Sequence, residues 1–220
     1  MYAHSGSAAN QQPTLVAAAK KCGQLLDTQR RRRGFSLVEA LVALSITALA
    51  GSVLLLSVDS SLATTIEALQ RTIADGMAQS VLDEMLTKRY EDIGGDPLAG
   101  ILSATPWELL GNGTERFNDV DDYAGYLAQP AEGVWGEPLG TGDDQGNLRL
   151  ENFRLRGDFF QNWRQRVVVS YVTANDHTVQ SASPTAYRAI EVIIEYVGTN
   201  GAVRPLATRK RVIAYVPPST

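Results

Sequence analysis

The chain has 220 residues, 44% of them hydrophobic, and a formal net charge of −4. That length accommodates one globular domain and a long helix, but not two large domains. Six of the 20 basic side chains and one of the 24 acidic ones lie in residues 1–34, so residues 35–220 retain 14 basic and 23 acidic groups and a net charge of −9. An acidic chain of this kind argues against nonspecific nucleic-acid binding as the main function.

Residues 1–34 differ in composition from the rest of the chain. They are rich in Ala, Ser and Gln, contain the single cysteine, Cys22, and end in Arg30-Arg31-Arg32-Arg33-Gly34. We interpret them as a basic cytoplasmic leader; a start codon assigned too far upstream would give the same composition. Because no cysteine follows Cys22, residues 35–220 form no internal disulfide, and their fold depends on its core.

An apolar run follows the arginines. From Phe35 to Val58 the sequence has 24 residues, and Glu39 is the only charged one. At about 1.5 Å of rise per residue, a helix of that length crosses a hydrocarbon core of roughly 30 Å. Because positively charged flanks stay in the cytoplasm, the sequence predicts a single-pass protein of the inner membrane whose C-terminal part lies outside.

The junction Arg33-Gly34-Phe35-Ser36-Leu37-Val38-Glu39 resembles the prepilin peptidase site of type IV pilins and type II secretion pseudopilins. The resemblance implies cleavage between Gly34 and Phe35, N-methylation of Phe35, and a pairing of Glu39 with a neighbouring subunit's N-terminal amine. It implies as partners a prepilin peptidase and methyltransferase, other pilin or pseudopilin subunits, an inner-membrane assembly platform and the lipid bilayer. The destination it implies is a pilus or a periplasmic pseudopilus.

The residue types at this junction fit that chemistry. A glycine before the scissile bond leaves a backbone that a protease at the membrane face can approach closely. An ionised Glu39 near hydrocarbon is costly, so it calls for a partner such as the new amine of Phe35. The alternative interpretation is that Glu39 reaches the membrane interface without a partner.

An ordinary secretory signal is a second interpretation of the same segment. Ala48-Leu49-Ala50 before Gly51 has the small-x-small pattern of a signal-peptide cleavage site, and cleavage after Ala50 would release a soluble domain. Apolar residues continue past that site through Val53-Leu54-Leu55-Leu56, where a secretory signal normally ends. We therefore favour the membrane-anchored interpretation of residues 35–58.

Residues 59–93 are predicted to continue the helix as an amphipathic segment, because apolar side chains recur every three or four residues. These side chains are Ile66, Leu69, Ile73, Met77, Val81 and Met85. We expect one helix from Phe35 to Lys88, which ends before Gly94-Gly95-Asp96-Pro97 and packs this apolar stripe on a sheet.

Residues 94–147 are rich in Gly, Pro and Asp and lack periodicity, which predicts an irregular loop region. Its segment from Phe117 to Tyr126 resembles part of a minor pilin of the mannose-sensitive haemagglutinin type of pilus. Aspartates in this region are candidate calcium ligands, but Asx-turns and caps are the favoured interpretation. They are Asp119, Asp121 and Asp122, with Asp143 and Asp144. Four aromatic residues are expected to cover the sheet: Trp107, Tyr123, Tyr126 and Trp135.

Residues 148–220 are predicted to form an antiparallel sheet. The expected strands are 148–156, 164–173, 188–197 and 203–216. Gly198-Thr199-Asn200-Gly201 supplies a hairpin turn, and Pro205 places the better part of the last strand at Ala207 to Tyr215. Together with the long helix, these strands predict an α+β fold similar to that of a type IV pilin.

Basic side chains at a spacing of two give an alternative function. They are Arg154, Arg156, Arg164 and Arg166. Some minor pilins bind DNA through such patches, so a filament-tip adhesin or DNA-binding module is the alternative. Ion pairs with Glu191 and Glu195 on the neighbouring hairpin are the favoured interpretation, which leaves nucleic acid an unfavoured partner.

The sequence predicts no enzyme and no cofactor. His177 is the only histidine after residue 34, and the chain contains no nucleophile elbow, glycine-rich phosphate loop or zinc-ligand spacing. The 186 residues from Phe35 to Thr220 exceed the size of most major pilins by family resemblance. We therefore expect a minor pilin or pseudopilin, a structural subunit that assembles through its N-terminal helix.

Overall fold

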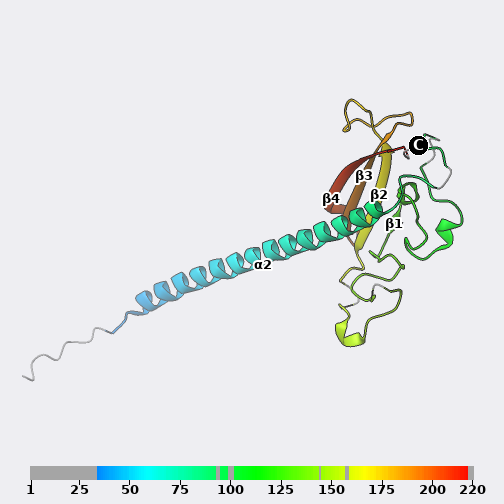
Figure 1. Ribbon diagram of the computed structural model, residues 1–220. Coiled ribbons are helices and arrows are strands. Elements are labelled where there is room, and N and C mark those ends of the chain that lie inside the picture. The colour runs from blue at the N-terminus through cyan, green and yellow to red at the C-terminus, as the bar shows by residue number, and fades with distance from the viewer. Residues whose placement is uncertain (1–33, 93–94, 99–101, 144, 157–158, 218–220) are drawn as a thin grey trace, which may run out of the picture. The chain divides into compact units, whose positions relative to one another are not determined.

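A computed structural model describes residues 34–92, 95–98, 102–143, 145–156 and 159–217. The chain divides into two compact units, Met1–Val58 and Asp59–Thr220, and helix α2, Leu37–Thr87, contributes to both (Figure 1). The helix was expected from Phe35 to Lys88, so its observed bounds lie within two residues of the prediction. Gly51 and Gly76 are both helical, although each lowers helix propensity.

In the second unit, four strands form one antiparallel sheet in the order β1-β2-β3-β4 (Figure 1). They are β1 Leu127–Ala128, β2 Trp163–Tyr171, β3 Tyr187–Val197 and β4 Val203–Ala214. Side chains alternate between buried and half-buried along β2, which is the pattern of a strand with one face on the core. A long N-terminal helix packed on a C-terminal antiparallel sheet confirms the predicted α+β, pilin-like fold.

The face of α2 that enters the core coincides with the predicted stripe only in its C-terminal part, where Met85 is buried. The buried helical residues are Ala74, Ala78, Leu82 and Met85, which pack with Trp163, Val167, Ile190, Val192 and Ile194 of the sheet. Met77 and Val81 are half-buried, whereas Ile66 and Leu69 are exposed, so the N-terminal part of the predicted stripe was wrong. Ala74 and Ala78 place small side chains at this contact, and small side chains let a helix lie close to a sheet.

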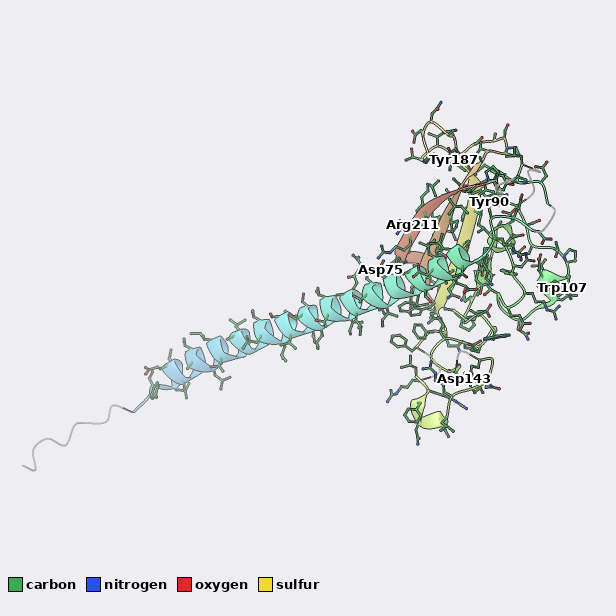
Figure 2. All side chains as sticks on the ribbon, viewed as in Figure 1. Asp75, Tyr90, Trp107, Asp143, Tyr187 and Arg211 are labelled. Atoms are coloured by element: carbon green, nitrogen blue, oxygen red, sulfur yellow. The ribbon has the colours of Figure 1, made fainter. Side chains whose placement is uncertain are left out.

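Charged side chains also join α2 to the edge strand β4 within the second unit. Arg209 of β4 forms an ion pair with Asp75 of α2, which Figure 2 labels. Arg204 lies 3.5 Å from the Glu67 carboxylate in the same way. All four side chains are about half-exposed, so solvent screens both pairs and they add little to stability.

Two strand predictions need correction. Residues 148–156 form no strand: their side chains are exposed, and the 3₁₀ helix η3 occupies Glu151–Phe153. Pro205 does not delay the last strand, because β4 begins at Val203 and Pro205 pairs with Glu195 beside a register shift at Ile194/Glu195. A bulge on an edge strand tolerates proline, which has no N–H to contribute to the ladder.

The predicted hairpin turn between β3 and β4 is confirmed. The Gly198 N–H donates to the Ala202 carbonyl and the Gly201 N–H donates to the Gly198 carbonyl, both at 2.8 Å. Gly201 has φ 78°, a left-handed conformation that glycine adopts without steric cost.

Candidate functional site

The predicted cleavage bond lies in non-helical chain before α2. Residues 34–36 have no regular secondary structure, and the Phe35 side chain is 78% exposed. A Cβ added at Gly34 would meet no atom within 4 Å, and Gly34 has no positive φ. Packing and backbone conformation in this chain therefore do not require glycine at position 34.

Ser36 caps the start of the helix. Its side-chain oxygen accepts a hydrogen bond from the Glu39 N–H at 3.1 Å, and α2 begins at the next residue, Leu37. Ser36-x-x-Glu39 is the sequence of a capping box, a signal that the sequence analysis did not use. Glu39 is exposed in the first turn, where a carboxylate interacts favourably with the positive end of the helix dipole.

The rest of the sequence-predicted site is only partly described. Phe35, Leu37 and Val38 are exposed with Glu39 at the helix start, so Gly34, Phe35 and Glu39 are adjacent at one end of α2. The predicted leader arginines, Arg30 to Arg33, lie outside the residues that the structure describes.

The helical residues of the first unit present an apolar surface. Leu37, Leu44, Leu49 and Val53 are each more than 60% exposed. The hydroxyls within the run are satisfied by their own helix: Ser45 donates to the Leu41 carbonyl and Thr47 to the Ala43 carbonyl, both at 2.8 Å. In the part of the chain that the structure describes, one helix, α2, is long enough and apolar enough to cross a membrane, judged by length and composition alone.

The aspartates proposed as calcium ligands are engaged in local hydrogen bonds. Asp122 accepts from the backbone N–H groups of Asn118 and Asp119, at 2.8 and 3.2 Å, and Asp119 accepts from those of Asp121 and Asp122, at 2.7 and 3.3 Å. Within the described ranges, no group of three His, Cys, Asp or Glu side chains could hold a metal ion. Asp144 lies outside those ranges, and Asp143 makes an Asx-type turn to Gln145 and Asn147 (Figure 2).

Asp121 instead pairs with a buried arginine. Arg188 of β3 is 1% exposed, lies 2.6 Å from the Asp121 carboxylate and donates to the backbone carbonyls of Tyr90 and Pro97. Its guanidinium also lies over the rings of Tyr90 and Tyr171, with centroid distances of 4.0 and 5.4 Å. Arg188 therefore ties the loops around residues 90, 97 and 121 to the sheet, an anchor that no sequence motif indicated.

Burial sets the charge state of these acids. It raises the pKa of Asp121 to about 7, against the opposing effect of Arg188. It also raises the pKa of Asp122 to about 7, although the N–H groups of Asn118 and Asp119 act in the other direction. Both carboxyls therefore take up protons near neutral pH, well above the usual range for aspartate.

The four arginines of the alternative function do not lie on two neighbouring strands, as the prediction requires. Arg164 and Arg166 form ion pairs with Glu195 at 2.6 and 3.0 Å. The sequence predicted ion pairs of this kind with Glu195. Burial would raise the pKa of Glu195, but the hydrogen bonds from Arg166 and Arg164 hold it below its usual value. Arg154 and Arg156 are exposed in the loop around η3, not on a strand.

The aromatic prediction was half right. Tyr123 is buried and Tyr126 packs against the core, where both meet the ring of Phe117 edge to face. Trp107 and Trp135 are 61% and 45% exposed, so they do not cover the sheet (Figure 2 labels Trp107). His177 lies with its ring 4.7 Å from that of Tyr187.

Comparison with known proteins adds one match, at the helix start. The family model of the prokaryotic N-terminal methylation motif matches residues 29–55, which include Gly34, Phe35, the cap and Glu39. No curated protein and no solved structure matches the chain. The chain is thus a protein with an N-terminal methylation motif on a long apolar helix.

That combination fits a type IV pilin or pseudopilin. The family is structural and not enzymatic, and its motif implies processing by prepilin peptidase and assembly with other pilins. The apolar helix is consistent with membrane anchoring and pilus-type assembly.

Proposed function

We propose that this protein is the precursor of a minor pilin or pseudopilin. Prepilin peptidase removes a leader of residues 1–34 by cutting between Gly34 and Phe35, and the new amine of Phe35 is methylated. The mature subunit is held in the inner membrane by residues 35–58, with its sheet outside, until it enters a pilus or pseudopilus. The observation that carries the proposal is the methylation-motif match at residues 29–55, which begins before the arginines and ends inside α2.

The local geometry supports cleavage at this bond. Residues 34–36 are outside the helix, so the backbone there needs no unwinding before it enters a protease. A Cβ added at Gly34 would meet no atom of the described residues within 4 Å, so that side of the backbone is open. Ala50 and Gly51, at the rival secretory site, lie in the interior of α2 with their backbone N–H and carbonyl groups inside the helix ladder.

We propose that Glu39 sets the register of the subunit in the filament. The assembly brings it to the methylated amine of Phe35 on a neighbour, so that two charges offset one another where water is scarce. In the free subunit Glu39 is exposed and has no ion pair among the described residues, which leaves its carboxylate free for such a partner.

The proposal is tested by mass spectrometry of the mature N-terminus in two matched variants. Gly34→Leu is expected to leave the full-length chain uncut, whereas Ala50→Leu, which adds an apolar side chain at an exposed helical position, still yields methylated Phe35. A secretory signal predicts the reverse: Gly34→Leu would be processed and Ala50→Leu would not. A mature chain that starts at Gly51 refutes the proposal.

Assembly is tested separately with Glu39→Gln. We expect this variant to be cut and methylated at Phe35 but to be absent from sheared filaments. Asp59→Asn, a second exposed carboxylate on α2, is the control and is expected to assemble normally. Normal incorporation of Glu39→Gln would refute the register role without affecting the cleavage result.

A further inference from the structure

A pocket of about 420 Å³ lies in the second unit, between α2 and the loop at residues 132–139. Gly76 to Glu84 of the helix form one wall, the loop forms the other, and Gln165 of β2 contributes to the lining. That volume falls within the range of about 300–1,000 Å³ that small-ligand sites occupy.

Three carboxylates line this pocket: Glu84, Glu132 and Glu137. Glu84 accepts hydrogen bonds from the Thr114 and Tyr123 hydroxyls at 2.7 and 2.6 Å, and Glu132 accepts one from the Tyr126 hydroxyl at 2.9 Å. In the described part of the chain, no Lys, Arg or His side chain forms an ion pair with any of the three. The pocket therefore concentrates negative charge that the fold does not neutralise.

Glu137 is the member of this set that points to a ligand. It is 8% exposed, and its Oε2 atom is buried without a hydrogen-bond partner among the described residues. A buried carboxylate oxygen without a donor is costly, and such orphaned groups are rare in folded proteins. Glu137 also lines the pocket, so a rotation of its carboxylate would bring this oxygen to a donor bound there.

Two glycines make room for this carboxylate. A Cβ at Gly142 would stand 1.9 Å from the Glu137 Cγ, and a Cβ at Gly133 would stand 2.6 Å from its Oε1. Side chains at either position would displace Glu137 from its place in the pocket lining. The two glycines therefore leave the space that the Glu137 side chain occupies.

Apolar side chains also line the pocket. Met77 and Val81 of α2 face the pocket together with Leu139, and Trp135 is half-exposed at its lining. Apolar walls suit an aliphatic stem, and an indole ring attracts a cation placed over its face. A bare metal ion does not fit, since the described acids offer no group of three that could hold one.

We propose that this pocket binds a guanidinium or alkylammonium group carried on an apolar stem. The stem lies against Met77, Val81 and Leu139, and the cationic head reaches Glu137 beside Glu132 and Glu84. An arginine or lysine side chain of another subunit has this chemistry, and so does a free polyamine. The site is separate from the helix start, so it does not depend on the processing proposed above.

The test is titration of the full-length chain in detergent micelles with n-butylguanidinium, followed by calorimetry and by Trp135 fluorescence. n-Butylurea, which has nearly the same shape but no charge, is the ligand control. We expect saturable binding of the guanidinium alone. Binding of both compounds with equal affinity, or of neither, overturns the proposal.

Two variants locate the site. Glu137→Gln removes the orphaned charge and is expected to weaken binding at least about tenfold, the loss typical of one charged hydrogen bond. Its thermal unfolding temperature is expected to equal or exceed that of the unmodified protein, because an unpaired buried charge is lost. Glu151→Gln, an exposed acid on η3, is the control and is expected to bind normally.

Gly76→Met provides a second way to block the pocket. A Cβ at Gly76 meets nothing within 4 Å, so the side chain extends over the opening without disturbing the helix. Unchanged guanidinium binding in both Glu137→Gln and Gly76→Met would refute the assignment. A photo-crosslinker at position 135 in assembling cells then separates the sources: a link to another subunit identifies a protein side chain, and its absence a free cation.

Discussion

Arg188→Met tests how the irregular loops are fastened to the sheet. The variant keeps most of the buried volume but loses the ion pair with Asp121, the bonds to the Tyr90 and Pro97 carbonyls, and the contacts over the rings of Tyr90 and Tyr171. Removing one partner of a buried ion pair costs about 3–5 kcal/mol of unfolding free energy. We expect the cost to approach that value as pH rises above 7, because Asp121, with a pKa of about 7 beside Arg188, is then ionised in the unmodified protein.

The same substitution should cost less at pH 5. There Asp121 carries a proton, so the loss of Arg188 leaves no uncompensated charge. Because Arg188 lowers the Asp121 pKa, the variant's pKa rises further, and its deficit grows by about 1.4 kcal/mol per pH unit between the two pKa values. We therefore expect the destabilisation at pH 8 to exceed that at pH 5 by at least about 1 kcal/mol.

Urea unfolding of the full-length chain in micelles measures this difference, with the buried Trp163 as the fluorescent reporter of the sheet. Arg211→Met on β4 is the control: Arg211 is exposed and has no ion pair among the described residues, so we expect a change below about 0.5 kcal/mol (Figure 2). A destabilisation that is equal at the two pH values, or below 1 kcal/mol at pH 8, would refute the anchoring role.

Two further predictions concern the helix cap at Ser36 and the buried carboxyls of Asp121 and Asp122. Ser36→Ala removes the bond to the Glu39 N–H, worth about 1 kcal/mol, so hydrogen exchange of that amide should become about fivefold faster, while Ser52→Ala in the helix interior leaves it unchanged. For the acids, a raised pKa means that the native state binds more protons than the unfolded chain between the ordinary aspartate pKa of 3.8 and about 7. Stability should therefore fall as pH rises through that window, and Asp122→Asn should flatten the slope; a slope of the same size in the variant would contradict the assignment.

The long helix and the strands β2 and β3 were predictable from their periodicity, and the start of β4 was predictable from the turn before it. An apolar run followed by spacings of three and four located α2 to within two residues at either end. Alternation along 163–171 and 187–197, with a Gly-rich turn after the second, located β2, β3 and the start of β4. The strand β1 was missed because two residues carry no detectable pattern.

The errors have physical causes of two kinds. Residues 148–150 and 154–156 alternate leucine and arginine like a strand, but residues 151–153 form the helix η3 between them, and the side chains on both sides remain exposed. On α2, the helix contacts the sheet through Ala74 and Ala78, which a search for large apolar residues passes over. Depth of burial depends on the partner surface, and a single element's sequence does not contain that surface.

The candidate site likewise has a part that the sequence predicts and a part that it does not. The short motif at Gly34, Phe35 and Glu39 was recognisable because its residue types and spacing are specific, and Ser36 was detectable from its capping box. Arg188 and the Glu137 pocket were not, since their partners come from segments tens of residues apart. Only the folded chain brings these groups together.

The open surroundings of Gly34 have a consequence for any mutational scan of this protein. A selection for folded chain should tolerate substitutions at position 34, because a Cβ there meets no described atom within 4 Å. A selection for processed chain should reject nearly all of them under the proposed cleavage. The difference between the residues accepted in the two selections would measure the specificity of the protease at this position, without a contribution from the stability of its substrate.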